Sequence, residues 1–203
     1  MTGTPDPFQN RAPDAHTGGR PFATFLERLR EVQDLVAQAA PPEDVLAEAE
    51  AALARVGDLL RPWAAPESRV PPGHRLDLPG RGNPLLPPFL IDEETADTVR
   101  GRVRFTPYFV GGNHAAHGGA LPLFFDDILG RLSNAHGRAP ARTAYLHVNY
   151  RRITPIGPEL SFDARIDREE GRKRFLSGVL HDAGGHVVAD ADGLFVVLLP
   201  GQP

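Results

Sequence analysis

The chain has 203 residues, of which 41% are hydrophobic, and a formal net charge of −4. This length suits one domain with an appendage, and because acids and bases are interspersed without a basic stripe, no nucleic-acid partner is expected. The absence of cysteine excludes disulfides, thiolate nucleophiles and Cys-ligated metals. No segment is apolar enough to span a membrane and no signal-peptide pattern follows Met1, so we expect a cytoplasmic protein without a membrane partner.

The N-terminal part of the chain predicts a tail followed by two helices. Residues 1–20 mix Pro, Gly, Asp and Thr without periodicity, which is typical of a flexible tail. Residues 21–61 carry apolar side chains at helical spacing on both sides of Pro41–Pro42 and end before Pro62, which predicts a helical hairpin. We expect this hairpin to pack as a cap on the main domain, with a lid or partner-binding element as the alternative.

A connector and a mixed α+β domain follow. Residues 62–90 are rich in Pro and Gly, which indicates an irregular connector laid on the surface. Residues 91–203 are expected to form the main domain. Apolar residues alternate with arginines from Val99 to Phe105, and further strand-like runs, separated by turns, cover residues 141–152, 160–168, 172–181 and 186–199. The packing that buries their apolar faces lays an antiparallel sheet around a central helix.

That central helix lies in residues 117–132. Its apolar side chains recur at helical spacing, and because Pro122 fits only a first turn, the helix should begin near Gly118–Gly119. Two glycines leave backbone N–H groups uncovered at the positive end of the helix dipole, which suits a developing oxyanion. Asp126 follows seven residues after Gly119 and is a candidate catalytic acid.

The spacing between these groups has a geometric consequence. Seven residues advance about 10.5 Å along a helix and return to nearly the same face. Reacting atoms must lie about 3–3.5 Å apart, so Asp126 cannot attack a carbonyl held by its own helix start. If both groups serve one active site, they come from two copies with antiparallel helices. The alternative is that the glycines only permit close packing and Asp126 is a solvated helix residue.

Together with this α+β plan, three segments resemble the hot-dog fold and, within it, the PaaI-like acyl-CoA thioesterases. The strongest is His117-Gly-Gly119 followed by Asp126; the others are the strand from Thr143 to Arg152 and the pair Glu170–Lys173 with Ala191–Phe195. The resemblance covers about residues 84–199. It implies an antiparallel sheet wrapped around a central helix, an acyl-CoA thioesterase activity, and a homodimer or a dimer of dimers.

The same resemblance assigns roles to individual residues. Asp126 would be the catalytic carboxylate, acting as nucleophile or as general base for water, and the Gly119 N–H of the other subunit would polarise the thioester oxygen. His117 would orient the loop at the helix start, and the Thr143 hydroxyl would steady the acid or its water. Relatives often carry an asparagine six residues before the histidine; here that position is Gly111, and Asn113 is the candidate replacement.

No metal or cofactor is expected, since a thioester carbonyl is electrophilic and its thiolate leaves easily. Coenzyme A enters only as part of the substrate. A metal site built from His114, His117 and Asp126–Asp127 is a weaker alternative, because the two histidines lack a helical frame. Basic residues near strand ends are candidates for binding the coenzyme A phosphates, with a solvated basic rim as the alternative reading: Arg151, Arg152, Arg172, Lys173 and Arg174.

Two other functions compete with thioester hydrolysis. The first is a non-catalytic protein that binds or senses acyl-CoA in the same pocket. The second is a hot-dog dehydratase or hydratase, which uses a differently arranged Asp/His pair that this sequence does not show.

Overall fold

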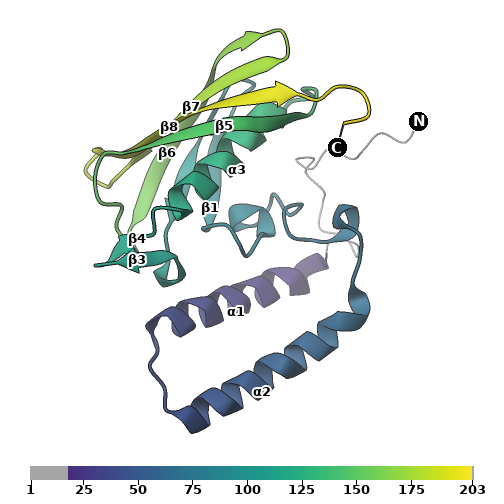
Figure 1. The fold of residues 1–203 in the computed structure, drawn as a ribbon, viewed down its shortest axis with the longest axis vertical. Coiled ribbons are helices and arrows are strands. Elements are labelled where there is room, and N and C mark those ends of the chain that lie inside the picture. The colour runs from purple at the N-terminus through teal and green to yellow at the C-terminus, as the bar shows by residue number, and fades with distance from the viewer. Residues whose placement is uncertain (1–17, 203) are drawn as a thin grey trace.

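The computed structural model describes residues 18–202, so that nearly all of the predicted N-terminal tail lies outside the described residues. The helices are α1 (Gly19–Gln38), α2 (Glu43–Leu60) and α3 (Ala120–Asn134). The strands are β1 (Phe89–Glu94), β2 (Thr98–Arg104), β3 (Val110–Gly112), β4 (Ala115–Ala116), β5 (Ala141–Tyr150), β6 (Glu159–Glu170), β7 (Lys173–His181) and β8 (Val187–Val197). Figure 1 shows α3 lying against one face of the large sheet, with α1 and α2 beyond its lower end.

The large sheet is antiparallel throughout, with strand order β1-β2-β6-β7-β8-β5. The predicted α+β fold is confirmed, and the five strands expected from alternation are present. The sequence analysis missed β1, whose pairing partner is β2, and the predicted boundary between residues 90 and 91 falls inside it. The prolines at positions 87 and 88 made Phe89 and Leu90 read as part of the connector.

The core forms where α3 meets the inner face of the sheet. Phe124 is fully buried and makes edge contacts with three aromatic rings from the sheet and its flanking loop, with centroid distances of 6.1 Å to Phe89, 6.2 Å to Phe105 and 5.1 Å to Phe162. The apolar positions that predicted the helix, among them Leu121, Ile128, Leu129 and Leu132, are all buried here. The period of 3.6 residues therefore identified the face that the sheet covers.

The helix α1 packs on the main domain through the connector. The Asp34 carboxylate accepts a hydrogen bond of 2.9 Å from the Tyr108 N–H, in the loop that leads to α3. Arg30 donates to the carbonyl of Pro79, and buried Arg75 binds Asp77 through two hydrogen bonds and the Gly19 carbonyl through a third. The predicted irregular connector is thus held by side chains that satisfy its backbone carbonyls.

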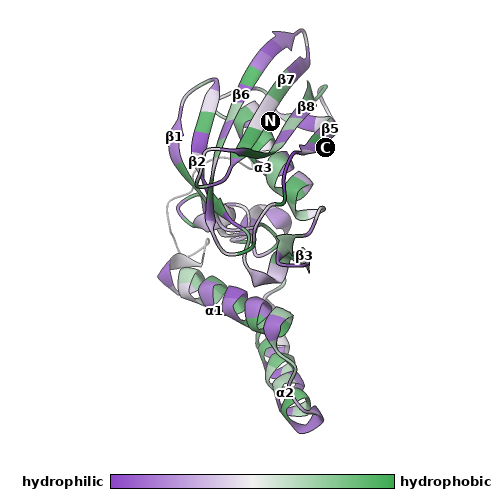
Figure 2. Ribbon diagram, turned by 90° about the vertical axis from the view of Figure 1, so that its left-hand side faces the viewer, coloured by the Kyte–Doolittle hydropathy of each residue, from purple (hydrophilic) through white to green (hydrophobic). Residues whose placement is uncertain are grey.

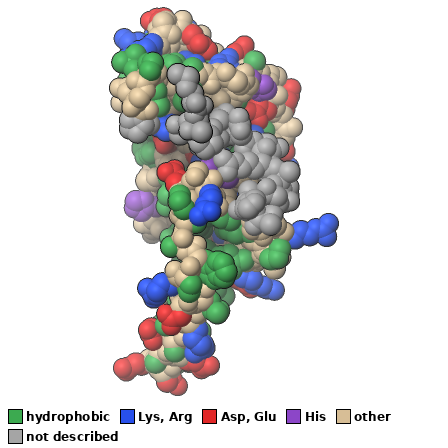
Figure 3. Space-filling view, turned by 90° about the vertical axis from the view of Figure 1, so that its right-hand side faces the viewer, with side chains coloured by type: hydrophobic (Ala, Val, Ile, Leu, Met, Phe, Trp, Pro, Cys, Tyr) green, Lys and Arg blue, Asp and Glu red, His purple; other side chains and the backbone are tan. Residues whose placement is uncertain are grey.

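The helix α2 behaves differently, so the expected cap is right for α1 and wrong for α2. None of its residues is buried, and large side chains such as Leu53 and Leu59 are exposed, the latter by 73%. Figure 2 shows α2 projecting below the sheet with hydrophobic residues along the helix, and Figure 3 shows hydrophobic side chains on the surface of this lower part of the molecule. Pro41–Pro42 and Pro62 delimit the helix, and no described element faces its apolar side closely enough to bury it. Among the described residues, no helix combines the length and the apolarity needed to cross a membrane.

The aromatic cluster gives a direct test of the core. Phe124→Ala is expected to lower the free energy of unfolding by about 3–5 kcal/mol, because it removes a fully buried ring and leaves a cavity. Leu59→Ala on α2 is the control and should change it by less than about 0.5 kcal/mol. Urea unfolding measures both, and equal effects of the two substitutions would contradict this view of the core.

Candidate active site

The N-terminus of α3 presents the predicted glycines. The helix begins at Ala120, with Gly119 as its N-cap, as the sequence predicted. The Gly119 N–H donates a hydrogen bond of 3.0 Å to Nδ1 of its own His117, and the Gly118 carbonyl accepts one of 2.8 Å from the Tyr150 hydroxyl. This geometry requires an unprotonated Nδ1 on His117. A substrate oxygen that binds the Gly119 N–H must therefore replace this imidazole nitrogen.

Asp126 and Thr143 meet on the exposed side of α3. The Thr143 hydroxyl, on β5, donates a hydrogen bond of 2.7 Å to Asp126 Oδ1. Asn134 fixes this register, because its side-chain oxygen accepts a hydrogen bond of 2.7 Å from the Ala141 N–H at the start of β5. The structure thus brings together two residues that lie 17 positions apart in sequence.

Asp127, the next residue of α3, is more buried than Asp126. Its two carboxylate oxygens accept hydrogen bonds from Arg81 Nε, at 3.0 Å, and Arg81 Nη2, at 2.5 Å. Arg81 comes from the connector, and its side chain and that of Asp127 are only 12% and 9% exposed. Burial raises the pKa of the Asp127 carboxyl, whereas the Arg81 cation lowers it.

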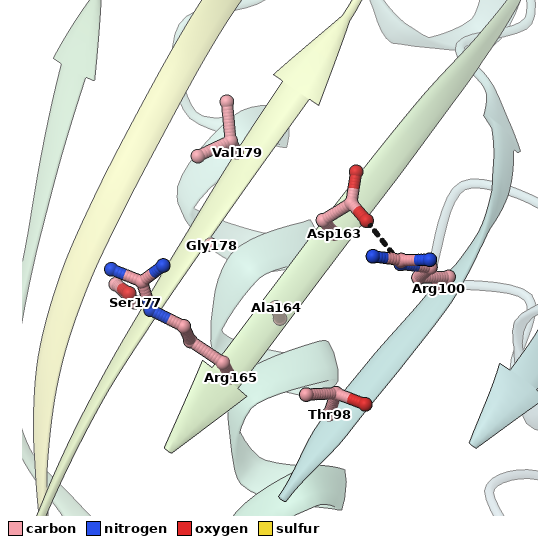
Figure 4. A pocket seen from close by; sticks show the side chains of 8 residues that line it. All are labelled: Thr98, Arg100, Asp163, Ala164, Arg165, Ser177, Gly178 and Val179. Carbon is pink, nitrogen blue, oxygen red and sulfur yellow. Dashed lines mark ion pairs between the residues drawn. The ribbon is translucent and has the colours of Figure 1, made fainter. Parts of the chain in front are cut away.

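These residues line one cavity of about 190 Å³. Its walls come from the connector, α3, β5 and β8: Arg81, Asp126, Asp127, Gly130, Asn134, Ala141, Arg142, Thr143 and Phe195. A larger hollow of about 310 Å³ lies on the face of the sheet away from α3 (Figure 4). There, Arg100 pairs with Asp163 at 2.7 Å and none of the predicted catalytic residues is present, so the smaller cavity is the candidate site.

Asn113 lies apart from this cavity. It occupies the tip of the β3–β4 hairpin with a φ of 48°, and its exposed side chain makes no hydrogen bond within the described residues. Gly111 stands where relatives often carry an asparagine, and the reason is steric. A Cβ at this position would lie 2.6 Å from the His117 Cα. An asparagine cannot occupy position 111 on this backbone, and the structure does not bring Asn113 to Asp126 within one chain.

The predicted phosphate-binding residues form two separate pairs. Lys173 aligns with Val196 of β8 and follows Arg172 in the β6–β7 turn, whereas Arg151 and Arg152 both donate their N–H groups to the Val188 carbonyl. Positions 188 and 196 are about 26 Å apart at roughly 3.3 Å per residue. The predicted basic residues do lie near strand ends, but within one chain they form two groups that are far apart.

Arg174, the fifth candidate for binding phosphates, has its guanidinium inside the protein. It is buried and donates to the Ser133 carbonyl in the last turn of α3, at 2.6 Å, and to the Ala139 carbonyl beyond that turn, at 2.8 Å. A cation at a helix C-terminus satisfies carbonyls that have no partner inside the helix. Arg174 is thus structural. Within residues 18–202, no three His, Asp or Glu side chains cluster as metal ligands would.

Sequence reasoning missed Arg81, although the sequence carries a signal for it. The segment Gly80-Arg81-Gly82 has φ values of 60°, 56° and 68°. Three successive residues in the left-handed region need glycines at the flanks and form a tight turn that displays the middle side chain. A Gly-Arg-Gly motif in a proline-rich connector is therefore a recognisable sign of an arginine held in a fixed position.

Comparisons with known proteins agree with this architecture. The sequence model of the family described as "Thioesterase superfamily" matches residues 113–189. Acyl-coenzyme A thioesterase THEM4 from Bos taurus is 32% identical over 95 residues, which are 46% of this chain and 38% of that protein. The chain therefore matches well under half the length of this curated relative.

Two solved structures show how much of the fold is shared. The crystal structure of protein RHA08564, described as a thioesterase superfamily protein, superposes with a TM-score of 0.75 at 25% identity and covers 92% of this chain and 94% of its own. The structure of smu.793 from Streptococcus mutans UA159, described as bound to acetyl CoA, has a TM-score of 0.52 at 21% identity over 54% of this chain and 88% of its own. At 92% coverage the first match includes much of the N-terminal extension, whereas the second match covers only about half of the chain.

The buried ion pair predicts a pH-dependent stability. Arg81→Gln should lower the free energy of unfolding by about 3 kcal/mol at neutral pH, because it leaves the Asp127 carboxylate buried and without its ion-pair partner. The folded variant then binds a proton at Asp127 more tightly than the unfolded chain. The loss in free energy of unfolding relative to wild type is therefore largest above the raised pKa of Asp127. This loss shrinks as the pH falls through that pKa.

Urea unfolding at about pH 8 and about pH 5 measures this difference. Arg100→Gln is the matched control, because its ion pair with Asp163 is largely exposed and should contribute little at either pH. A deficit of Arg81→Gln that is equal at both pH values would contradict the assignment of the pH dependence to Asp127.

Proposed function

The domain formed by the sheet and α3 belongs to the thioesterase superfamily and has the hot-dog fold, and on this premise we propose that the chain hydrolyses acyl-CoA-type thioesters at Asp126. The single observation that carries the proposal is the hydrogen bond of 2.7 Å from Thr143 to Asp126 inside the candidate cavity. It places an acid and a hydroxyl, the two side chains that hydrolysis with a positioned water needs, at one point of the surface.

The chemistry follows from the way Asp126 is held. Thr143 occupies Oδ1, and the carboxylate lies on the exposed side of α3, where a substrate or a water can reach it. Acting as a nucleophile, Asp126 attacks the thioester carbon, the thiolate leaves, and water cleaves the resulting anhydride. Acting as a general base, it takes a proton from the water that attacks the same carbon. Both routes need donors for the negative charge that develops on the carbonyl oxygen.

Those donors come from a second copy in our proposal. Asp126 lies two helical turns, about 10.5 Å, from Gly119 of its own chain. Antiparallel α3 helices in a two-fold dimer place the Gly119 N–H of each copy opposite Asp126 of the other. The substrate oxygen then takes the position of His117 Nδ1 as the acceptor of that N–H.

The edge strand β5 supports such a dimer. It lies at the end of the sheet order, so within residues 18–202 no strand lies beside one edge of its backbone, and Tyr145 and Tyr150 on it are about half exposed. An unpaired edge with exposed apolar side chains favours pairing with another strand, here the β5 of a second copy. A dimer of dimers is compatible with this arrangement.

In the same two-fold arrangement, the two separate groups of basic residues come together across the dimer. Lys173 of β7 and Arg142 of β5 both pair with Val196 of the strand between them, at the Thr143 end of β5. Arg151 follows Tyr150, whose hydroxyl donates a hydrogen bond to the Gly118 carbonyl. In an antiparallel dimer, Arg151 and Arg152 of one copy approach Arg172 and Lys173 of the other. We propose that this combined set binds coenzyme A phosphates, the ligand chemistry suggested by the THEM4 relative and by the neighbour bound to acetyl CoA.

The first test removes the proposed catalytic carboxylate. Asp126→Asn should lower thiol release from a panel of acyl-CoAs by about 100-fold or more, because the amide can neither attack nor accept a proton. Asp167→Asn, on the outer face of the sheet, is the control and should retain wild-type rates. Equal rates for Asp126→Asn and wild type would remove the assignment, and binding of acyl-CoA without thiol release by wild type would indicate a sensor instead.

The second test asks whether each active site needs residues from two copies of the chain. Gly119→Pro removes the N–H, and the φ of −71° at this position suits proline; Gly119→Ala keeps the N–H and is the control. Equal mixing of inactive Asp126→Ala with inactive Gly119→Pro should restore roughly a quarter of the wild-type activity, because half of the dimers are hybrids with one intact site each. Mixtures that stay inactive although hybrid dimers form would show that each chain works alone.

A further inference from the structure

The connector holds Arg81 rigidly at the edge of the candidate cavity. The Arg81 carbonyl accepts a hydrogen bond of 3.0 Å from the Gly73 N–H, and Arg81 Nη1 donates one of 2.7 Å to the Gly73 carbonyl. Its flanking glycines have no room for a side chain: a Cβ on Gly80 would lie 3.1 Å from the Pro87 carbonyl oxygen, and one on Gly82 would lie 3.0 Å from the Arg75 Cβ. Arg81 itself has a φ of 56°, a left-handed backbone conformation that is strained for a residue other than glycine.

This turn places one cation beside two adjacent acids. Arg81, Asp126 and Asp127 line the same cavity, and the Arg81 guanidinium binds both oxygens of Asp127. Asp126 is left with the Thr143 hydroxyl as its hydrogen-bond partner in the structure. The connector thus divides the roles of the two carboxylates: one is neutralised by an ion pair and the other is available to a ligand.

We propose that Arg81 is a positioning residue for the proposed hydrolysis, and that the N-terminal extension contributes to the active site through it. Arg81 removes the repulsion between Asp127 and Asp126, and Asp127 keeps the Arg81 cation from binding Asp126. The inference rests on the proposed function, since it assigns a role to the surroundings of the same carboxylate.

The charges around Asp126 determine what each substitution does. The cavity around Asp126 is also lined by Arg81 of the connector, Asp127 of α3 and Arg142 of β5. Arg131 of α3 acts electrostatically on Asp127. Arg131 is itself paired with Glu94 of β1 at 2.6 Å. Loss of Arg81 therefore leaves Asp127 negative and unpaired at neutral pH, and neutral once the pH falls below its raised pKa.

The experiment is a pH profile of kcat for wild type, Arg81→Gln, Asp127→Asn and the double variant. Arg81→Gln should lose roughly tenfold in kcat at about pH 8 and regain it as the pH falls, because protonated Asp127 no longer repels its neighbour. Asp127→Asn should lose activity at every pH, since the Arg81 guanidinium, once it has lost the Asp127 carboxylate, then binds Asp126. The double variant has neither charge and should exceed both single variants, with the pH profile of wild type.

The control is Arg75→Gln. Arg75 is as deeply buried in the connector and binds Asp77, but it does not line the cavity. Its loss should lower Tm and leave the shape of the kcat profile unchanged. Circular dichroism at each pH establishes that every variant is folded, and the double variant, which leaves no charge of the pair unpartnered, remains informative if a single variant unfolds.

Three results would overturn the role of Arg81. These are a profile of Arg81→Gln that runs parallel to wild type, the same new pH dependence in Arg75→Gln, or a double variant less active than both single ones. Failure of the proposed function is distinguished in the same series. It appears as no thiol release by wild type, or as wild-type rates in Asp126→Asn, whatever the Arg81 variants do.

Discussion

The burial of α3 against the inner face of the sheet is the constraint on which the rest of the structure depends. A helix covered by a curved sheet can expose polar groups only at its ends and along one side. Its C-terminal end is tied to the sheet through Arg174, which binds two carbonyls there, and through Asn134, which binds the start of β5. Because these contacts fix the register of β5 on the helix, Thr143 meets Asp126.

The two adjacent acids on that helix show how environment separates chemically identical groups. Asp126 and Asp127 differ by one residue, about 100° around the helix. That rotation exposes the first to the surface and presses the second against the connector, where Arg81 neutralises it. Desolvation raises the pKa of the Asp127 carboxyl and the Arg81 cation lowers it, so the charge of this buried group depends on the ion pair.

The N-terminal extension thereby has a physical connection to the candidate site. Asp34 of α1 binds the loop before α3, and Arg30 binds the connector backbone that carries Arg81. These contacts satisfy buried carbonyls and N–H groups that the irregular connector cannot pair internally. The match to RHA08564, which covers 92% of this chain, is long enough to include much of this extension.

Local pattern alone determined the helices, five of the six sheet strands and the core face of α3, because periodicity records which side of each element is buried. Spacing also identified Gly119 and Asp126 as candidates, whereas Thr143 became a candidate only through the resemblance to the PaaI-like thioesterases. Only the tertiary structure decided that Arg81 reaches Asp127, that Arg174 is structural and that the basic residues lie at two ends of the sheet. These are contacts between segments far apart in the chain, and no local pattern specifies which distant side chain will satisfy a buried charge or carbonyl.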